Sequence, residues 1–277
     1  MNYLLIDLKA TKTNMLQSLG LLAPAPVMPA VLMAHALDHK LPQPLGITGV
    51  GIVHQHATPW IEHLDKQNGY LERALVQRRG ACLFDKHDIA SGSGAGPQQN
   101  AMQPMALADI ELTVLLQCER SLSDHEHVRE TLLRMRLAGG PIHSAYVSGY
   151  STWDEAIAQT LRGGHWVEDA TDLLTDAPDP LSAALDAVRS RDNGWIVPAN
   201  LGYALLEPPR ERRGARDGRH HAFAEPMIGL IRYVPATTAR SPERALSPQD
   251  LWRYGWDADQ FLITNRRGIS LQPNLNS

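Results

Sequence analysis

Apolar residues occupy every even position from Ala108 to Cys118, and polar residues occupy most of the odd positions between them. This period of two predicts an antiparallel strand with one half-exposed face. Shorter apolar runs predict further strands at 3–8, 47–53 and 142–147. Within one of these runs Gly49 and Gly51 alternate with larger apolar residues. Glycines inside a strand indicate that another group approaches the backbone closely.

Two helices are expected between these strands. The segment 30–40 predicts the first helix, because it follows a proline suited to a first helical turn. Ser123 and Glu126 have the spacing of a capping box and predict the start of the second helix. Gly139 and Gly140 are expected to end that helix, just before the strand at 142–147.

The order strand, helix, strand, strand, helix, strand predicts an α+β protein with a split βαββαβ domain of the ferredoxin-like, RNA-recognition type over residues 1–150. A long insertion at 57–105 interrupts this domain and carries a Gly/Ser stretch at 91–96. An insertion of that composition is typical of a projecting hairpin or thumb, or of a mobile loop. Residues 151–277 predict an α/β extension of helices and strands that packs on the core.

Charge is distributed unevenly along the 277 residues, although the net charge is only −4. Residues 154–186 contain eight acids and one arginine, whereas five cations face two acids in each of the segments 66–86 and 210–219. The net charge argues against a uniformly basic nucleic-acid binder. The two basic clusters are candidates for phosphate contacts, with a solvated loop as the alternative for each.

Sequence signals of catalysis, metal binding and export are weak. Cys82 and Cys118 cannot form a disulfide framework, which favours a cytoplasmic protein, and no uninterrupted apolar span long enough for a membrane occurs. The chain contains neither a phosphate-binding loop motif nor a nucleophile-elbow motif. His54 and His56 could share one face of a strand as metal ligands, but no third ligand follows at a telling interval, so we expect neither a metal nor a cofactor.

Five short motifs occur in an order that resembles a known protein family. They lie at 49–54 (GVGIVH), 135–140 (MRLAGG), 194–203 (GWIVPANLGY), 215–217 (ARD) and 223–230 (FAEPMIGL). Together they are similar to the second Csy protein of type I-F CRISPR-Cas surveillance (Cascade) complexes, a member of the Cas-five group of the RAMP superfamily. The likeness covers most of the chain.

The resemblance implies a non-catalytic subunit of a ribonucleoprotein complex that binds the five-prime handle of the CRISPR RNA in antiviral defence. It implies pairing with the large Csy subunit at the foot of the complex and contact with the Csy backbone subunit. Target DNA near the protospacer-adjacent motif is a further candidate partner, and no membrane is implied. The candidate RNA-binding residues are Lys12, Asn14, Arg78, Arg79, Lys86, Arg136, Gly139, Gly140, His143, Arg212, Arg213 and Arg216.

Two other functions stay open. A precursor-RNA endoribonuclease of the Cas-five type would need a general base from among His54, His87 and His143, and a cation from Lys86 or Arg136. A structural module without RNA contact would need neither. The tryptophans of the C-terminal half predict an apolar patch that the large subunit buries; they are Trp195, Trp252 and Trp256.

Overall fold

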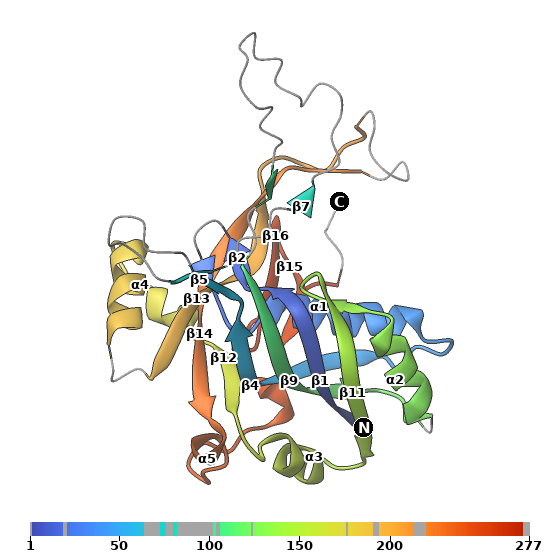
Figure 1. The fold of residues 1–277 in the computed structure, drawn as a ribbon. Coiled ribbons are helices and arrows are strands. Elements are labelled where there is room, and N and C mark those ends of the chain that lie inside the picture. The colour runs from blue at the N-terminus through green and yellow to red at the C-terminus, as the bar shows by residue number, and fades with distance from the viewer. Residues whose placement is uncertain are drawn as a thin grey trace.

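A computed structural model describes residues 2–18, 21–63, 73–75, 80–81, 102–103, 106–122, 124–175, 177–190, 194–212 and 220–273. The protein is α+β, with a mostly antiparallel sheet of ten strands in the order β10-β11-β1-β9-β4-β12-β14-β13-β16-β15 (Figure 1). Three short strand pairs lie outside it: β2 (Leu16–Ser18) with β3 (Leu21–Leu22), β5 (Ile61–His63) with β6 (Arg73–Leu75), and β7 (Gly80–Ala81) with β8 (Met102–Gln103).

The first 150 residues contain the predicted alternation of strands and helices. The elements are β1 (Asn2–Asn14), α1 (Val27–Lys40), β4 (Ile47–Pro59), β9 (Leu107–Cys118), α2 (His125–Leu133), β10 (Arg136–Leu137) and β11 (Gly140–Tyr150). Strand β1 lies between β9 and β11, and β9 lies between β1 and β4, with every pair antiparallel. The four long strands are therefore adjacent in the order β11-β1-β9-β4.

The C-terminal part continues the same sheet. Its strands are β12 (His165–Asp169), β13 (Trp195–Leu205), β14 (Ala224–Pro235), β15 (Arg253–Asp257) and β16 (Gln260–Thr264). Its helices are α3 (Trp153–Thr160), α4 (Pro180–Arg189) and α5 (Ala236–Ala239), with short 3-10 turns η1 (Thr171–Leu174) and η3 (Pro248–Asp250). Strand β12 joins the two parts, because it pairs with β4 on one side and with β14 on the other.

Apolar side chains cover both faces of the central strands. Helices α1 and α2 lie against one face, where Ile6, Leu112 and Leu132 are fully buried in the larger core cluster (Figure 1). On the other face α3 packs with Trp166 and Leu115 in a second cluster. The close approach expected at Gly51 is confirmed, because a β-carbon at this position would lie 2.8 Å from Cη2 of Trp166.

Three local predictions are wrong. Strand β9 is buried almost throughout, because α3 and Trp166 also cover its second face. Its polar Thr113 is satisfied across the sheet: Gln55 donates to the Thr113 hydroxyl, which donates to Asp7. Helix α2 begins after Asp124, whose side chain accepts from the His127 N–H, so the cap is not Ser123. The helix ends at Leu133 and not at the glycine pair.

Some predicted features lie outside the described residues. They are Arg78, Arg79, Lys86, His87 and the stretch 91–96 of the insertion, together with Arg213 and Arg216. Among the described helices none is long and apolar enough to cross a membrane.

Candidate nucleic-acid interface

The glycine pair forms a tight hairpin between β10 and β11. Leu137 pairs with Gly140, and the two residues between them have positive φ, 45° at Ala138 and 83° at Gly139. A two-residue loop with positive φ at both positions is a preferred hairpin turn, because its twist matches that of the strands. The positive φ values therefore fall at Ala138 and Gly139, and Gly140 is the first residue of β11.

Strand β1 holds this hairpin in place. The Asn14 N–H donates to the carbonyl of Ala138 at 3.0 Å. A β-carbon at Gly140 would lie 2.3 Å from the backbone oxygen of Thr11, whereas one at Gly139 would meet nothing within 4 Å. Gly140 therefore allows close packing on β1, and Gly139 is the residue with open space in front of it.

Six of the candidate RNA-binding residues gather around this hairpin. Arg136 is exposed and its Nη1 donates to the carbonyl of Gly139 at 3.0 Å. Lys12 has a φ of 56°, and its ammonium lies 5.7 Å from the ring centroid of Trp60. The six, from β1, β10 and β11, are Lys12, Asn14, Arg136, Gly139, Gly140 and His143.

Asn14 has a local structural role within this group. Its Oδ1 accepts from the backbone N–H of Leu16 at 3.1 Å and of Ala106 at 3.0 Å. The side chain therefore fixes the start of β9 against the end of β1. Among the six, Lys12 and Arg136 are the exposed cations, and Arg136 donates to the carbonyl of Gly139.

The open face next to the hairpin is a shallow pocket of about 510 Å³. Within it Lys9 pairs with Glu111 at 2.8 Å, and Asp109 accepts from the Thr11 hydroxyl. Burial raises the pKa of Asp109, but hydrogen bonds led by that of Thr11 outweigh it and lower the pKa overall. The face carries charges of both signs, so it is less basic than a typical phosphate-binding surface. The pocket is lined by Lys9, Ala10, Thr11, His56, Thr58, Asp109, Ile110, Glu111 and His143.

Arg212 lies on a different element, beyond the end of β13. Its guanidinium pairs with Glu207 and lies 4.4 Å from the ring centroid of Phe223. Glu207 also pairs with Arg210 at 2.9 Å, and the backbone N–H of Phe223 is the largest cause that lowers the pKa of this carboxyl. The Arg212 charge is therefore partly neutralised within the hairpin between β13 and β14.

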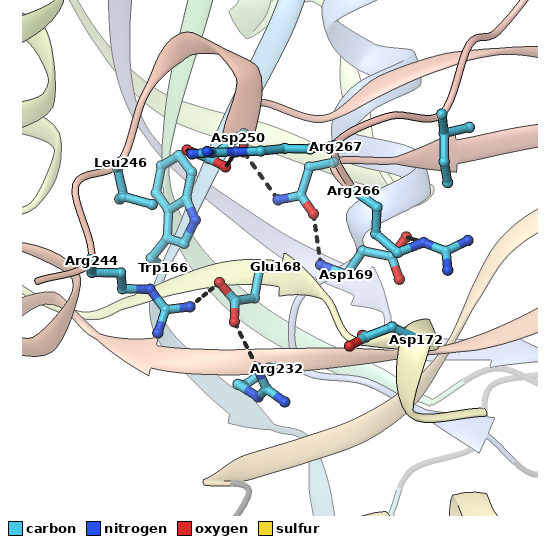
Figure 2. Close-up of a pocket in the computed structure, with 12 residues that line it drawn as sticks. Trp166, Glu168, Asp169, Asp172, Arg232, Arg244, Leu246, Asp250, Arg266 and Arg267 are labelled. Carbon is cyan, nitrogen blue, oxygen red and sulfur yellow. Dashed lines mark hydrogen bonds and ion pairs between the residues drawn. The ribbon is translucent and has the colours of Figure 1, made fainter. Parts of the chain in front are cut away.

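A pocket of about 550 Å³, which no sequence pattern indicated, lies between β12, β14 and the C-terminal turns (Figure 2). Its four arginines are paired with carboxylates. Glu168 binds both Arg232, at 3.1 Å, and Arg244; Asp169 lies 3.5 Å from Arg266; and Asp250 lies 2.7 Å from Arg267. We call this cavity the arginine pocket; the four arginines that line it are Arg232, Arg244, Arg266 and Arg267.

Several donors of the arginine pocket lack an acceptor. Trp166 is fully buried, its indole nitrogen has no hydrogen-bond partner, and Figure 2 shows that nitrogen on the pocket side of the ring. The Nε atom of Arg232 is also buried without a hydrogen-bond partner, whereas the buried Nε atom of Arg266 has the Asp169 carboxylate 3.5 Å away. Buried N–H groups without acceptors cost stability. No charge run marks this pocket, because its arginines are spread between 232 and 267.

The candidate general base His54 is buried. It is 5% exposed, packs edge-on against Tyr233 and Trp195, and its Nδ1 has no hydrogen-bond partner. Burial is the largest cause that lowers its pKa, to about 4, followed by the charges of His165 and His56. His56 is exposed, because the pairing of β4 with β9 shifts register between the two histidines, so they do not form one ligand pair.

The three tryptophans expected to form an apolar patch are in different environments. Trp252 is fully buried and donates to the carbonyl of Val167 at 2.9 Å, so it belongs to the core. Trp195 is 44% exposed and stacks on Tyr233 with ring centroids 4.1 Å apart. Trp256 is half-buried against Phe261. Of the three, Trp195 has the most surface available to a partner.

Comparisons with known proteins give little further information. No family model matches the chain, and no curated protein matches it. Among solved structures, the chain is similar to a CRISPR protein from Archaeoglobus fulgidus, with 8% sequence identity, 95% of this chain and 99% of that chain covered, and a TM-score of 0.27. A likeness of that extent establishes neither a shared fold nor a shared function. The fold and the site define an α+β protein with a mostly antiparallel sheet and two groups of cationic side chains.

Proposed function

We propose that this protein is a non-catalytic subunit of a type I-F CRISPR RNA-guided surveillance complex. It binds the five-prime handle of the CRISPR RNA and pairs with the large Csy subunit at the foot of the complex. The observation that carries the proposal is that candidate RNA-binding residues from two separate segments of the chain meet at the β10–β11 hairpin: Lys12 on β1, and Arg136, Gly139 and His143 on the hairpin side.

The strand order supports this proposal. The order β11-β1-β9-β4, with α1 and α2 on one face, is that of ferredoxin-like domains, a family of folds that includes the RNA-recognition modules. Those modules bind nucleotides on the face opposite the helices. Here α3 covers one part of that face, and the pocket beside the hairpin, lined by Lys9, Thr11 and His143 among others, lies on it as well.

The arginine pocket provides a second argument for a nucleic-acid ligand. RNA offers phosphate and base oxygens, which the partly exposed guanidinium groups of Arg244 and Arg267 could bind beside their carboxylate partners. The carboxylates hold the arginines in fixed positions, which reduces the entropy lost when a ligand binds.

A binding assay on the whole chain tests the proposal. A type I-F handle RNA and a scrambled RNA of equal length are titrated against the protein, alone and with the large Csy subunit, over a salt series. We expect tighter binding of the handle RNA and a negative salt slope. The double variant Lys12→Ala, Arg136→Ala should bind the handle about tenfold more weakly or worse. The matched control is Arg189→Ala, at the exposed end of α4.

The same samples separate the alternative functions. Intact RNA after incubation is expected for a binding subunit, whereas metal-independent cleavage at the handle boundary would support the endoribonuclease. Equal, weak binding of both RNAs in every combination of subunits would contradict handle recognition.

A further inference from the structure

His35 and His39 face each other on α1, one helical turn apart. Their Nε2 atoms lie 3.2 Å apart and form a hydrogen bond when one ring carries its proton there, and their ring planes are nearly perpendicular, at 88°. The hydroxyl of Tyr254, on β15, contacts Nδ1 of His35. His35 is half-buried and His39 is exposed. The pair is therefore fixed on one side by Tyr254 and accessible to solvent on the other.

The separation of the two nitrogens matches that of two ligands on one metal ion. Zinc binds imidazole nitrogens at about 2.0–2.1 Å, so two nitrogens on a tetrahedral ion lie about 3.3 Å apart. Histidines four residues apart lie on the same face of a helix. The backbone of α1 thus already has the spacing that a single ion between His35 and His39 requires.

Tyr254 occupies the position of an orienting partner. A histidine that binds a metal through one ring nitrogen commonly donates a hydrogen bond from the other, which fixes its tautomer and its ring orientation. The Tyr254 hydroxyl contacts Nδ1 of His35, so in the tautomer in which Nδ1 donates to this hydroxyl, Nε2 of His35 carries the lone pair that faces His39.

Asp38 places a negative charge near the histidine pair, but its carboxylate oxygens accept hydrogen bonds from backbone N–H groups. Its Oδ1 accepts from the backbone N–H groups of Leu45, at 2.5 Å, and Gly46, at 3.2 Å, and its Oδ2 accepts from Ile47 at 3.4 Å. These bonds hold the loop before β4. The carboxylate therefore favours a cation nearby without being free to coordinate it.

The pair opens into a groove of about 1060 Å³ between α1, β4 and residues 268–273. The described residues hold no group of three or more metal-ligating side chains, so an ion at this pair would keep open coordination positions. The groove has room for water or for a donor group of another molecule in those positions.

We propose that His35 and His39 bind one divalent transition-metal ion of the zinc, nickel or copper class, with Tyr254 as a positioning residue. Imidazole nitrogen suits these ions better than magnesium or calcium, which prefer oxygen ligands. The site lies apart from the hairpin residues and the arginine pocket, and it does not depend on the proposed RNA-binding function.

Metal titration of the full chain tests this site. The protein is prepared without a histidine tag, stripped with a chelator and titrated with Ni²⁺ or Zn²⁺ by calorimetry. We expect His35 and His39 to bind one equivalent of the metal ion. The affinity for this ion should be at least about tenfold lower in His39→Ala and about tenfold lower in Tyr254→Phe. With Cu²⁺, electron paramagnetic resonance should show two coupled nitrogens in the wild type and one in His39→Ala.

The matched control is His56→Ala, which removes an exposed histidine from β4 and should leave this equivalent unchanged. Equal melting temperatures without metal establish that the variants are folded, and exposed His39 can be replaced without loss of core packing. Unchanged one-equivalent binding in His39→Ala, or no binding by the wild type, would overturn the proposal. None of these measurements involves RNA.

Discussion

His54 and His56 are two residues apart on β4, yet one is buried and the other is exposed. The pairing with β9 shifts between them, which turns His54 toward Tyr233 and Trp195. A buried imidazole without a hydrogen-bond partner resists protonation. The residue type alone therefore does not reveal its role, because the local register decides which histidine can meet a ligand.

The stability of the protein should fall as the pH decreases from about 6.5 to about 4. Burial lowers the pKa of His54 to about 4, so in this range the unfolded chain takes up a proton that the folded chain does not. Below about pH 4, the difference between the folded and unfolded pKa of His54 lowers the free energy of unfolding by about 3 kcal/mol relative to neutral pH. Urea unfolding at several pH values measures it.

Replacing His54 tests the assignment of this pH dependence. His54→Leu should flatten the fall in unfolding free energy between pH 6.5 and 4, whereas His56→Ala should keep the wild-type slope. An equally steep fall in His54→Leu would show that other groups cause it.

At the scale of elements, the hydrophobic periodicity predicted the position of the strands correctly. It did not predict how deeply each strand is buried. The alternation from Ala108 to Cys118 correctly marked β9, but not its burial, because α3 and Trp166 cover the second face. Hydrogen bonds among Asp7, Gln55 and Thr113 satisfy the polar side chains there. Such cross-strand partners depend on register, which a local sequence pattern does not specify.

The β10–β11 hairpin gives a prediction that separates two adjacent glycines. Gly140→Ala should destabilise the protein by about 3 kcal/mol or more, because its β-carbon would overlap the backbone of β1. Gly139→Ala should cost only about 1 kcal/mol, the penalty for positive φ, because its β-carbon points into open space. Chemical denaturation of both variants provides the comparison. Similar losses at the two positions would contradict the packing of Gly140 on β1.

At the scale of the whole molecule, the sheet is continuous through the pairing of β12 with both β4 and β14. This continuity brings Glu168, Arg232 and Arg266 into one pocket from positions far apart in the sequence. The sequence indicated the order of the first six long elements and the basic segments. It could not indicate the arginine pocket, because that site requires strand pairings between distant segments.

The described parts of residues 1–150 and 151–277 should unfold together. The sheet crosses the boundary, and Trp166 packs on Gly51 of the other part. Calorimetry should show one main transition, with a van't Hoff enthalpy close to the calorimetric enthalpy. A chain cut after residue 150 should lose cooperative folding, because β4 would lose its neighbour β12. Two separate transitions, or a stable fragment 1–150, would contradict this coupling.

The contact between Gly51 and Trp166 also restricts how the sequence can change over evolution. A β-carbon at position 51 would lie 2.8 Å from Cη2 and 2.9 Å from Cζ3 of Trp166, so any larger residue there requires a smaller or displaced ring. Conversely, a smaller residue at 166 would leave a void that only a larger residue at 51 could fill. The two positions are therefore expected to vary as a pair among descendants of this sequence, although they lie 115 positions apart in the chain.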